Sequence, residues 1–407
     1  MRLASKFTAF FIAVAIFCTV LPINTAQAFS LSDLVAPTTG EANSQASVKS
    51  STGNNLWDML LGIILGTFIG KGGAPDKNAN GLPPSSSLTK NKELIGFMAE
   101  WWDGDKASLN SLKENSSQIQ TLSPFWATLN EDGIISNRGS SDHASVVQYA
   151  HAKKMPVMLL VNNAKEEKNG TLPIHTVLRN QELRSKSISS IETYIKEYGL
   201  DGVNIDFESV PAEDKSYLSA FMRELSARLK PQGYSVSIDV FPKQDESNDV
   251  AAAYDYTELA KYADKIIIMT YDNHGMWSGP GAIADIRWVE SSLKYALQFI
   301  PKNKLYLGVA AYGYDWSGKT TESVEYNQIT QLIKQNNASV LWDEPSKSPY
   351  FSYTGSDGQK HQVWFENAES LKYKLDLVNR YNLAGAAMWR LGGEDPACWS
   401  VIREKLK

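Results

Sequence analysis

The strongest constraint on the fold is an alternation, repeated along residues 93–407, between short apolar runs rich in β-branched residues and stretches of helical periodicity. The helical stretches, such as 188–198 and 218–229, carry apolar side chains every three or four positions. Eight strands that alternate with helices are the number that closes a (β/α)8 barrel. The sequence therefore predicts an α/β fold, a (β/α)8 TIM barrel, with strands at 94–98, 122–129, 157–161, 203–207, 234–241, 266–271, 305–310 and 385–389.

The segment between the seventh and eighth predicted strands, residues 311–384, is about twice as long as one loop and one helix require. Within it, two β-rich runs at 350–353 and 362–365 flank glycines that favour a turn, and this pattern indicates a hairpin. We therefore expect a small α+β insertion after the seventh strand, at about residues 316–366.

Residues 1–28 have the pattern of a secretory signal peptide. Arg2 and Lys6 precede an apolar run at 7–21, and a small-residue cleavage motif ends at Ala28. The expected localisation is therefore secreted or in the cell envelope.

Residues 29–92 form a low-complexity N-terminal region that precedes the barrel domain, 93–407. Two polar stretches, 37–55 and 71–92, flank an apolar segment at 56–70. This segment is shorter than the ~20 residues that span a bilayer. Two interpretations stay open: it contacts a membrane surface or another copy of the chain, or it is a short hydrophobic helix that docks on its own domain.

The charge balance argues against a nucleic-acid partner. The chain has 45 acidic and 40 basic residues, for a formal net charge of −5, whereas nucleic-acid binding is expected to require a basic patch. The five histidines are scattered without metal-ligand spacing, and no Gly-rich phosphate loop is present. We therefore expect no metal and no cofactor. Cys398 is the one cysteine after the predicted signal peptide, so no intramolecular disulfide is expected.

Residues 201–208, DGVNIDFE, place polar side chains on an otherwise apolar strand. Because side chains alternate across a strand, one face is apolar and suits the helical layer, and the other carries Asn204, Asp206 and Glu208 into the barrel. Burial and like charge raise the pKa of at least one of two enclosed carboxylates, as a general acid needs near neutral pH. Glu208 is at the C-terminal end of the strand, where such barrels hold their chemistry. A purely structural acid pair is the alternative, which three inward polar residues make less plausible.

This strand resembles the signature of glycoside hydrolase family 18, the chitinase-like barrels, which is DGxDxDxE. Asp201, Gly202, Asp206 and Glu208 match it, and Asn204 replaces the first inner Asp.

Further resemblance to the family is spread over 93–407. Residues 269–272, MTYD, look like its strand-6 motif MxYD, and Trp389 stands where the family has a strand-8 Trp. The stretches 279–283 and 307–316 are similar to the branch that contains bacterial spore-germination and cortex-lytic glucosaminidases.

The resemblance implies a role for each of four residues. Glu208 would protonate the glycosidic oxygen and then act as base on the incoming water. Asp206 would orient and stabilise the substrate's own 2-acetamido group as it closes on the sugar, and Tyr271 would donate a hydrogen bond to the acetamide carbonyl. Trp389 would form an apolar floor under the sugar.

Three more residues are expected to contact substrate. Asn204 and Asp272 are expected to do so from their places in the family's motifs. Trp126 rests on the residues alone: 11% of the chain is aromatic, and this indole on the second strand could stack on a sugar or pack in the core.

The sequence predicts an exported, retaining glycoside hydrolase that cleaves β-linked N-acetylglucosamine in peptidoglycan by substrate-assisted acid–base catalysis. A chitinase or chitooligosaccharide hydrolase is one alternative. A catalytically inactive carbohydrate-binding barrel is another: the retained Glu208 argues against it, and Asn204 argues for it. In each case the expected partner is a polysaccharide that contains N-acetylglucosamine.

Overall fold

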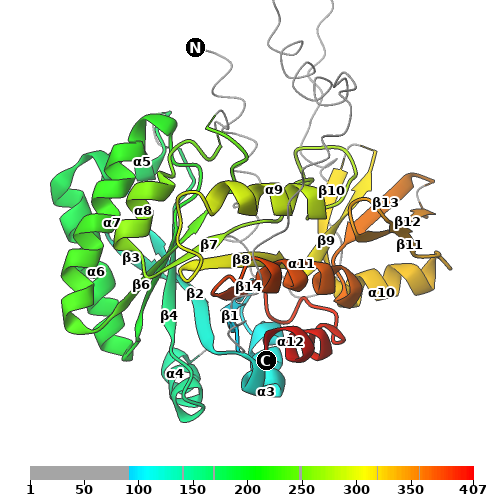
Figure 1. The fold of residues 1–407 in the computed structure, drawn as a ribbon, viewed down its shortest axis with the longest axis horizontal. Helices are drawn as coiled ribbons and strands as arrows, with labels where there is room; N and C mark the ends of the chain where they lie inside the picture. Colours follow the sequence, from blue (N-terminus) through cyan, green and yellow to red (C-terminus); the bar gives the residue numbers. More distant parts are fainter. Residues whose placement is uncertain (1–90, 140–141, 168–169, 247–249, 319, 357) are drawn as a thin grey trace, which may run out of the picture. The chain divides into compact units, whose positions relative to one another are not determined.

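Eight parallel strands build the barrel in the computed structural model, which describes residues 91–407 apart from 140–141, 168–169, 247–249, 319 and 357. These strands are β1 (Glu93–Met98), β2 (Thr121–Leu129), β4 (Met158–Asn163), β5 (Gly202–Asp206), β6 (Ser235–Val240), β7 (Lys265–Ile268), β8 (Leu305–Ala310) and β14 (Gly385–Trp389). Their hydrogen-bonded order is β1-β14-β8-β7-β6-β5-β4-β2, and β1 also pairs with β2, which closes the cylinder (Figure 1). The predicted (β/α)8 TIM barrel is confirmed.

Helices on the outside of the barrel connect successive strands, and one further helix follows the last strand (Figure 1). They are α3 (Ala107–Asn115), α4 (His143–Ala152), α5 (Pro173–Arg179), α6 (Gln181–Tyr198), α7 (Lys215–Leu229), α8 (Tyr256–Tyr262), α9 (Ile286–Ala296), α11 (Ala368–Arg380) and α12 (Cys398–Leu406). Shorter elements are β3 (Ile135–Asn137), antiparallel to β2, and the 3-10 turns Ser116–Gln118, Ala212–Asp214 and Lys230–Gln232.

Helix α6 illustrates why these segments are helical. Ile188, Ile191 and Ile195 lie at helical spacing and are buried against the strands. The Asn180 side chain accepts hydrogen bonds from the first turn, and Gly199 ends the helix in the left-handed conformation, at φ 66°.

The predicted alternation along β5 is confirmed. Val203, Ile205 and Phe207 are buried in the layer between strands and helices, which leaves the polar side chains of the strand inside the barrel. Close packing fixes the start of this strand, since a Cβ on Gly202 would lie 2.2 Å from the carbonyl oxygen of Ser235 on β6. Because β5 and β6 pair in parallel, their C-terminal ends lie at the same end of the barrel.

The expected α+β insertion follows β8. It contains β9 (Tyr312–Ser317), β10 (Thr320–Glu325), α10 (Tyr326–Gln335), β11 (Leu341–Asp343), β12 (Ser348–Thr354) and β13 (Lys360–Phe365). Its antiparallel sheet has the order β10-β9-β13-β12-β11, and β12 and β13 form the predicted hairpin. The sheet begins at Tyr312, before the expected start at 316, because only Ala311 separates β9 from β8.

The expected signal peptide, 1–28, and the apolar segment, 56–70, lie outside the described residues. Within the described part of the chain, no helix has the length and apolar character that crossing a membrane requires.

Candidate active site

Asn204 joins the inner faces of β5 and β6. Its Nδ2 donates to Oδ2 of Asp239 at 2.6 Å, and its Oδ1 accepts from Oγ of Ser237 at 2.6 Å. The parallel register pairs Asn204 with Ser237, which sets Asp206 beside Asp239 two positions further on. Both carboxyl groups are buried, so the barrel encloses an acid pair near the C-terminal ends of these strands.

Burial dominates the protonation of this acid pair. It raises the pKa of Asp206 to about 8; the charge of Glu208 acts in the same direction and that of Lys165 opposes it. Burial also raises the pKa of Asp239 well above its ordinary value, and the charge of Asp206 adds to this rise. Oδ1 of each carboxyl is buried without a hydrogen-bond partner. Near neutral pH the pair therefore retains a proton.

Glu208 lies just beyond β5, and Asn163 at the end of β4 holds its backbone. The Glu208 N–H donates to Oδ1 of Asn163 at 2.8 Å, and Nδ2 of Asn163 donates to the Glu208 carbonyl at 3.1 Å. The side chain of Glu208 is 26% exposed, so its carboxylate can reach a ligand at the mouth of the barrel.

Lys165, on the loop after β4, forms an ion pair with the Glu208 carboxylate. The Lys165 side chain is 15% exposed, and its charge also acts on Asp206. The site thus holds a cation directly beside the partly exposed carboxylate of Glu208.

Asp272 anchors the chain that follows β7. It adopts the left-handed conformation, at φ 58°, and its Oδ1 accepts from the hydroxyls of Tyr312 at 2.5 Å and Tyr314 at 3.0 Å. Burial raises the pKa of Asp272 to about 6, although these two hydrogen bonds act in the opposite direction. The insertion is therefore tied to the barrel mouth through its first strand.

Tyr271 interacts electrostatically with the carboxyl groups of the site. Burial raises the pKa of this hydroxyl well above the ordinary value. The charges of neighbouring carboxyl groups add to the rise, in decreasing order Asp239, Asp206, Asp272 and Glu208. The ring lies over β8, where a Cβ on Gly308 would come within 3.1 Å of it. Tyr271 is thus a protonated donor among acids.

Trp389, the last residue of β14, closes the inside of the barrel. It contacts Phe97, Trp101 and Phe125, with ring centroids 5.5, 6.2 and 6.3 Å away. The indole is partly buried and packs on the inner apolar cluster, so it offers an apolar surface inside the barrel.

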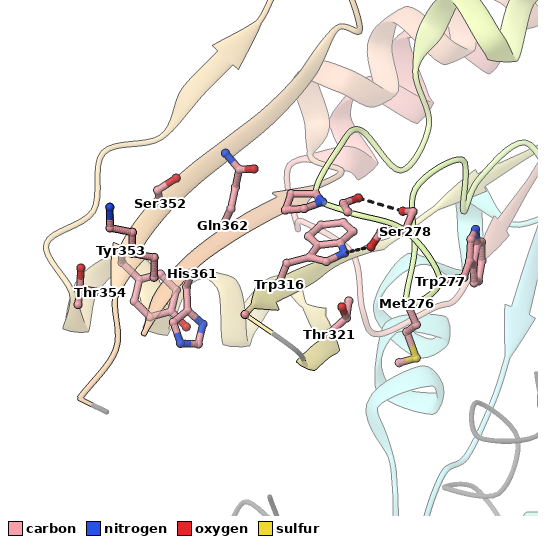
Figure 2. A pocket seen from close by; sticks show the side chains of 14 residues that line it. Met276, Trp277, Ser278, Trp316, Thr321, Ser352, Tyr353, Thr354, His361 and Gln362 are labelled. Carbon is pink, nitrogen blue, oxygen red and sulfur yellow. Dashed lines mark hydrogen bonds between the residues drawn. The ribbon is translucent and has the colours of Figure 1, made fainter. Parts of the chain in front are cut away.

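A pocket of about 640 Å³ lies between the loop after β7 and the hairpin of the insertion. Figure 2 shows Met276 and Trp316 on one side and Tyr353 and His361 on the other. Tyr314 connects this pocket to the acids, since its ring centroid is 5.6 Å from that of Trp316 and its hydroxyl bonds Asp272. Aromatic rings therefore run from the acid cluster into the pocket.

Two of the predicted substrate contacts need correction. Trp126 is 1% exposed and stacks on His143 at 3.9 Å, in the layer between β2 and the helices, whereas its neighbour Phe125 faces inward. Asn204 is also 1% exposed, and both atoms of its amide bond β6. The first is a core residue, and the second supports Asp239.

Comparison with known proteins identifies the family of the barrel. The profile of the glycosyl hydrolases family 18 matches residues 93–394, three quarters of the chain with the acid strand included. The chain belongs to glycosyl hydrolase family 18.

Three similar proteins illustrate the relationship. An uncharacterized glycosylase, YvbX, of Bacillus subtilis is 31% identical over 320 residues, which are 77% of this chain and 93% of that protein. The crystal structure of the Bacillus cereus spore cortex-lytic enzyme SleL superimposes with a TM-score of 0.71 at 26% identity, over 78% of this chain and 76% of that one. The crystal structure of a chitinase from Chromobacterium violaceum superimposes with a TM-score of 0.70 at 26% identity, over 77% of this chain and 99% of that one. This family 18 protein is a glycosidase.

Electrostatic interactions link Glu208, Asp206, Tyr271 and Asp272 at the C-terminal ends of the barrel strands, and Trp389 ends the neighbouring strand β14 on the inner apolar cluster. Three contributors were missed. Asp239 lies on the same face of β6 as Ser237, and this alternation of polar residues is the signal that could have found it. Lys165 lies in a loop without a distinctive pattern, and Tyr312 begins a strand, β9, that falls between the predicted seventh strand at 305–310 and the expected insertion at about 316–366. In the described residues, no cluster of three or more His, Cys, Asp or Glu side chains is arranged to hold a metal ion.

Proposed function

We propose that this family 18 glycosidase cleaves β-linked N-acetylglucosamine in peptidoglycan with retention of configuration, using the substrate's acetamide as nucleophile. The observation that carries the proposal is Oδ1 of Asp206, a buried acceptor without a hydrogen-bond partner, on a carboxyl group that interacts electrostatically with Glu208 and Tyr271. A buried acceptor is stable only when something satisfies it, and an acetamide N–H has the matching chemistry.

In the first step the Glu208 carboxyl protonates the glycosidic oxygen, and the bond from the anomeric carbon to that oxygen breaks. The acetamide oxygen forms a bond to the anomeric carbon and closes a five-membered ring. Asp206 accepts the acetamide N–H and stabilises the positive charge that develops there. The Tyr271 hydroxyl donates to the acetamide oxygen and holds it in line, and Trp389 supports the sugar from below.

In the second step Glu208, now a carboxylate, takes a proton from water, and the water oxygen attacks the anomeric carbon. The ring opens, the acetamide is restored and Glu208 is protonated again. Two displacements at one carbon retain the β configuration. Family 18 enzymes are an exception to the rule of two catalytic carboxylates because the substrate supplies the nucleophile.

Lys165 favours peptidoglycan over chitin. The identities to the cortex-lytic enzyme and to the chitinase are both 26%, so similarity alone does not separate the substrates. In peptidoglycan the sugar after N-acetylglucosamine carries a lactyl group next to the scissile oxygen, and an acidic peptide can extend from it. A cation beside Glu208 suits that negative charge and has no counterpart in neutral chitin.

We also propose that the protein is exported to the cell surface, on the pattern of residues 1–28, and that the apolar segment 56–70 holds it on a membrane surface or on another copy of the chain. N-terminal sequencing of protein from the culture medium tests cleavage after Ala28. Vesicle sedimentation and light scattering, with and without residues 29–90, separate the two uses of the apolar segment.

Mass analysis of products from purified peptidoglycan and from chitin oligomers tests the substrate. The proposal expects fragments with N-acetylglucosamine at the new reducing end, and a higher kcat/KM on peptidoglycan fragments. A preference of about tenfold or more for chitin, equal to about 1.4 kcal/mol of transition-state binding, would overturn the peptidoglycan assignment.

A further inference from the structure

The acid strand lacks one carboxylate of the family signature, because Asn204 stands where the first inner Asp is expected. The structure has a carboxylate in the same neighbourhood on the adjacent strand. Asp239 of β6 accepts a hydrogen bond from Asn204 at 2.6 Å, and it is 3% exposed. Asn204, at the position of the acid that the signature expects, is therefore hydrogen-bonded directly to the buried acid Asp239.

We propose that Asp239 is the proton partner of Asp206, and that it supplies from β6 the buried carboxyl group that the signature has at position 204. The inference rests on the proposed substrate-assisted reaction. Asp239 does not reach the sugar in this arrangement, so it is a positioning residue that acts through Asp206.

The hydrogen bonds of Asp239 fit this task. Its Oδ2 is occupied by the amide of Asn204, and the amide is itself fixed by Ser237, so the carboxyl cannot rotate freely. Its Oδ1 is buried and has no hydrogen-bond partner, and the same holds for Oδ1 of Asp206. One oxygen on each acid is thus available to share a proton. Asn204 in place of Asp lets the strand donate to Asp239, which a second carboxylate could not do.

The surroundings disfavour two negative charges on this pair. Glu208 faces it from the end of β5, Tyr271 from the chain after β7, and Tyr254 from the segment before α8. Lys165 is the cation that acts on Asp206, and it is already engaged with Glu208. Burial and the charge of Glu208 keep one proton on the pair, whereas both tyrosines are neutral, in agreement with the raised pKa of both acids.

The proton moves within the pair during catalysis. In the resting site it is shared, which keeps Asp206 from carrying a full buried charge. When the acetamide oxygen bonds the anomeric carbon and positive charge develops on the acetamide, the proton passes to Oδ1 of Asp239 and Asp206 becomes the carboxylate that balances this charge. When water opens the ring, the proton returns to its shared position, so the pair neither gains nor loses a proton in the cycle.

Moving the acid between the strands tests the proposal. The Asp239→Asn side chain has the shape of the original carboxyl group. With its amide oxygen turned towards Asn204, it can still accept the hydrogen bond from Nδ2 of Asn204. We expect kcat on a peptidoglycan fragment to fall about tenfold or more while KM changes by less than about twofold, since the contact matters in the transition state. The apparent pKa values of the kcat profile shift, because the proton of the pair is then held by Asp206 alone.

The double variant Asn204→Asp/Asp239→Asn returns an acid to the strand position of the family signature, and we expect it to recover most of the lost kcat and the original pH profile. Ser237→Ala is the matched control: it removes a hydrogen bond from Asn204 without removing an acid, and the pH profile keeps its position. Thermal unfolding checks each variant for folding, and the double variant decides the question if the single one does not fold.

A folded Asp239→Asn variant with unchanged kcat and pH profile would overturn the proposal, as would a folded double variant no more active than the single one. These results leave the proposed function intact as long as the parent protein hydrolyses its glycan. A parent that cleaves neither glycan would overturn the proposed function and this inference together.

Discussion

Asn163 and Glu208 bond each other twice, through the Glu208 N–H to Oδ1 at 2.8 Å and from Nδ2 to the Glu208 carbonyl at 3.1 Å. Both bonds use the backbone of Glu208, so the position of this residue at the barrel mouth does not depend on its carboxylate. The side chain is left to the ion pair with Lys165 and to a ligand.

This arrangement predicts that Glu208→Gln keeps the fold and loses activity. The amide has the size of the carboxyl but cannot transfer the proton, and general acid–base catalysis contributes roughly 10²–10⁴-fold. Initial rates on peptidoglycan fragments measure the loss, and an unchanged melting temperature within a few degrees serves as the folding control. A variant that cleaves as fast as the parent would remove Glu208 from the mechanism.

Asp206→Asn and Tyr271→Phe are expected to lower kcat more than they raise KM. Both groups serve the acetamide as it closes, a contact that strengthens in the transition state. Steady-state kinetics separates the two constants. The same reasoning expects an oligomer without N-acetyl groups to be inert, so its efficient cleavage would contradict substrate assistance.

Lys165→Met is expected to reduce discrimination between peptidoglycan and chitin. The ratio of kcat/KM on a fragment with a free lactyl carboxylate to that on a chitin oligomer of equal length should fall about tenfold, or about 1.4 kcal/mol. Lys165→Arg keeps the positive charge and should retain most of the ratio.

Lys265→Met supplies the matched control for this ratio. Lys265 forms an ion pair with Glu93 at the opposite end of the barrel, and its side chain is 17% exposed against 15% for Lys165. Because each ratio compares two substrates on one variant, a change in stability cancels. An equal fall of the ratio in both variants would show that Lys165 does not recognise the substrate.

The raised pKa of Asp272, about 6, makes a prediction for stability. Between about pH 4 and 6 the folded protein holds a proton that the unfolded chain has released, so this group's contribution to stability is lost as the pH rises through 6. The stability of the parent relative to Asp272→Asn should therefore fall over this window and level off above about pH 7. Urea unfolding at several pH values measures it.

Glu192 is the control with the opposite sign. Hydrogen bonds from Lys196, Gln232 and Arg228 lower its pKa to about 2, so its contribution is present above about pH 4.5 and lost as the pH falls towards 2. The stability of the parent relative to Glu192→Gln should rise with pH from about 2 to 4.5. The same slope for both variants would mean that global charge, and not these groups, sets the dependence.

The sequence predicts the acid strand well because its period-2 pattern is regular. Val203, Ile205 and Phe207 are buried against the helices, as the alternation requires, and the polar side chains follow on the inside. The site residues on this strand could therefore be assigned from spacing and the family motif.

The error at Trp126 has a local cause. The pairing of β2 with β4 shifts register between Phe125 and Ala127. Counting alternate residues forward from Leu122 turns Trp126 outward, whereas counting back from Leu129 turns it inward, and the irregularity lies where these two counts meet. A bulge of this kind leaves no pattern in a single sequence.

Asp239 and Lys165 were missed for different reasons. Asp239 is on a strand that resembles its neighbours, and its meaning depends on register against β5, which only pairing reveals. Lys165 reaches Glu208 from a loop, and the path of a loop depends on contacts that are distant in sequence.

The configuration of the first product tests the central claim most directly. Proton NMR of a peptidoglycan fragment during hydrolysis records the anomer at the new reducing end before it equilibrates. The account predicts that the β anomer of N-acetylglucosamine appears first, since closure of the acetamide and attack by water invert the carbon twice. Initial formation of the α anomer would mean a single displacement by water, and it would contradict the roles given to Asp206 and Tyr271.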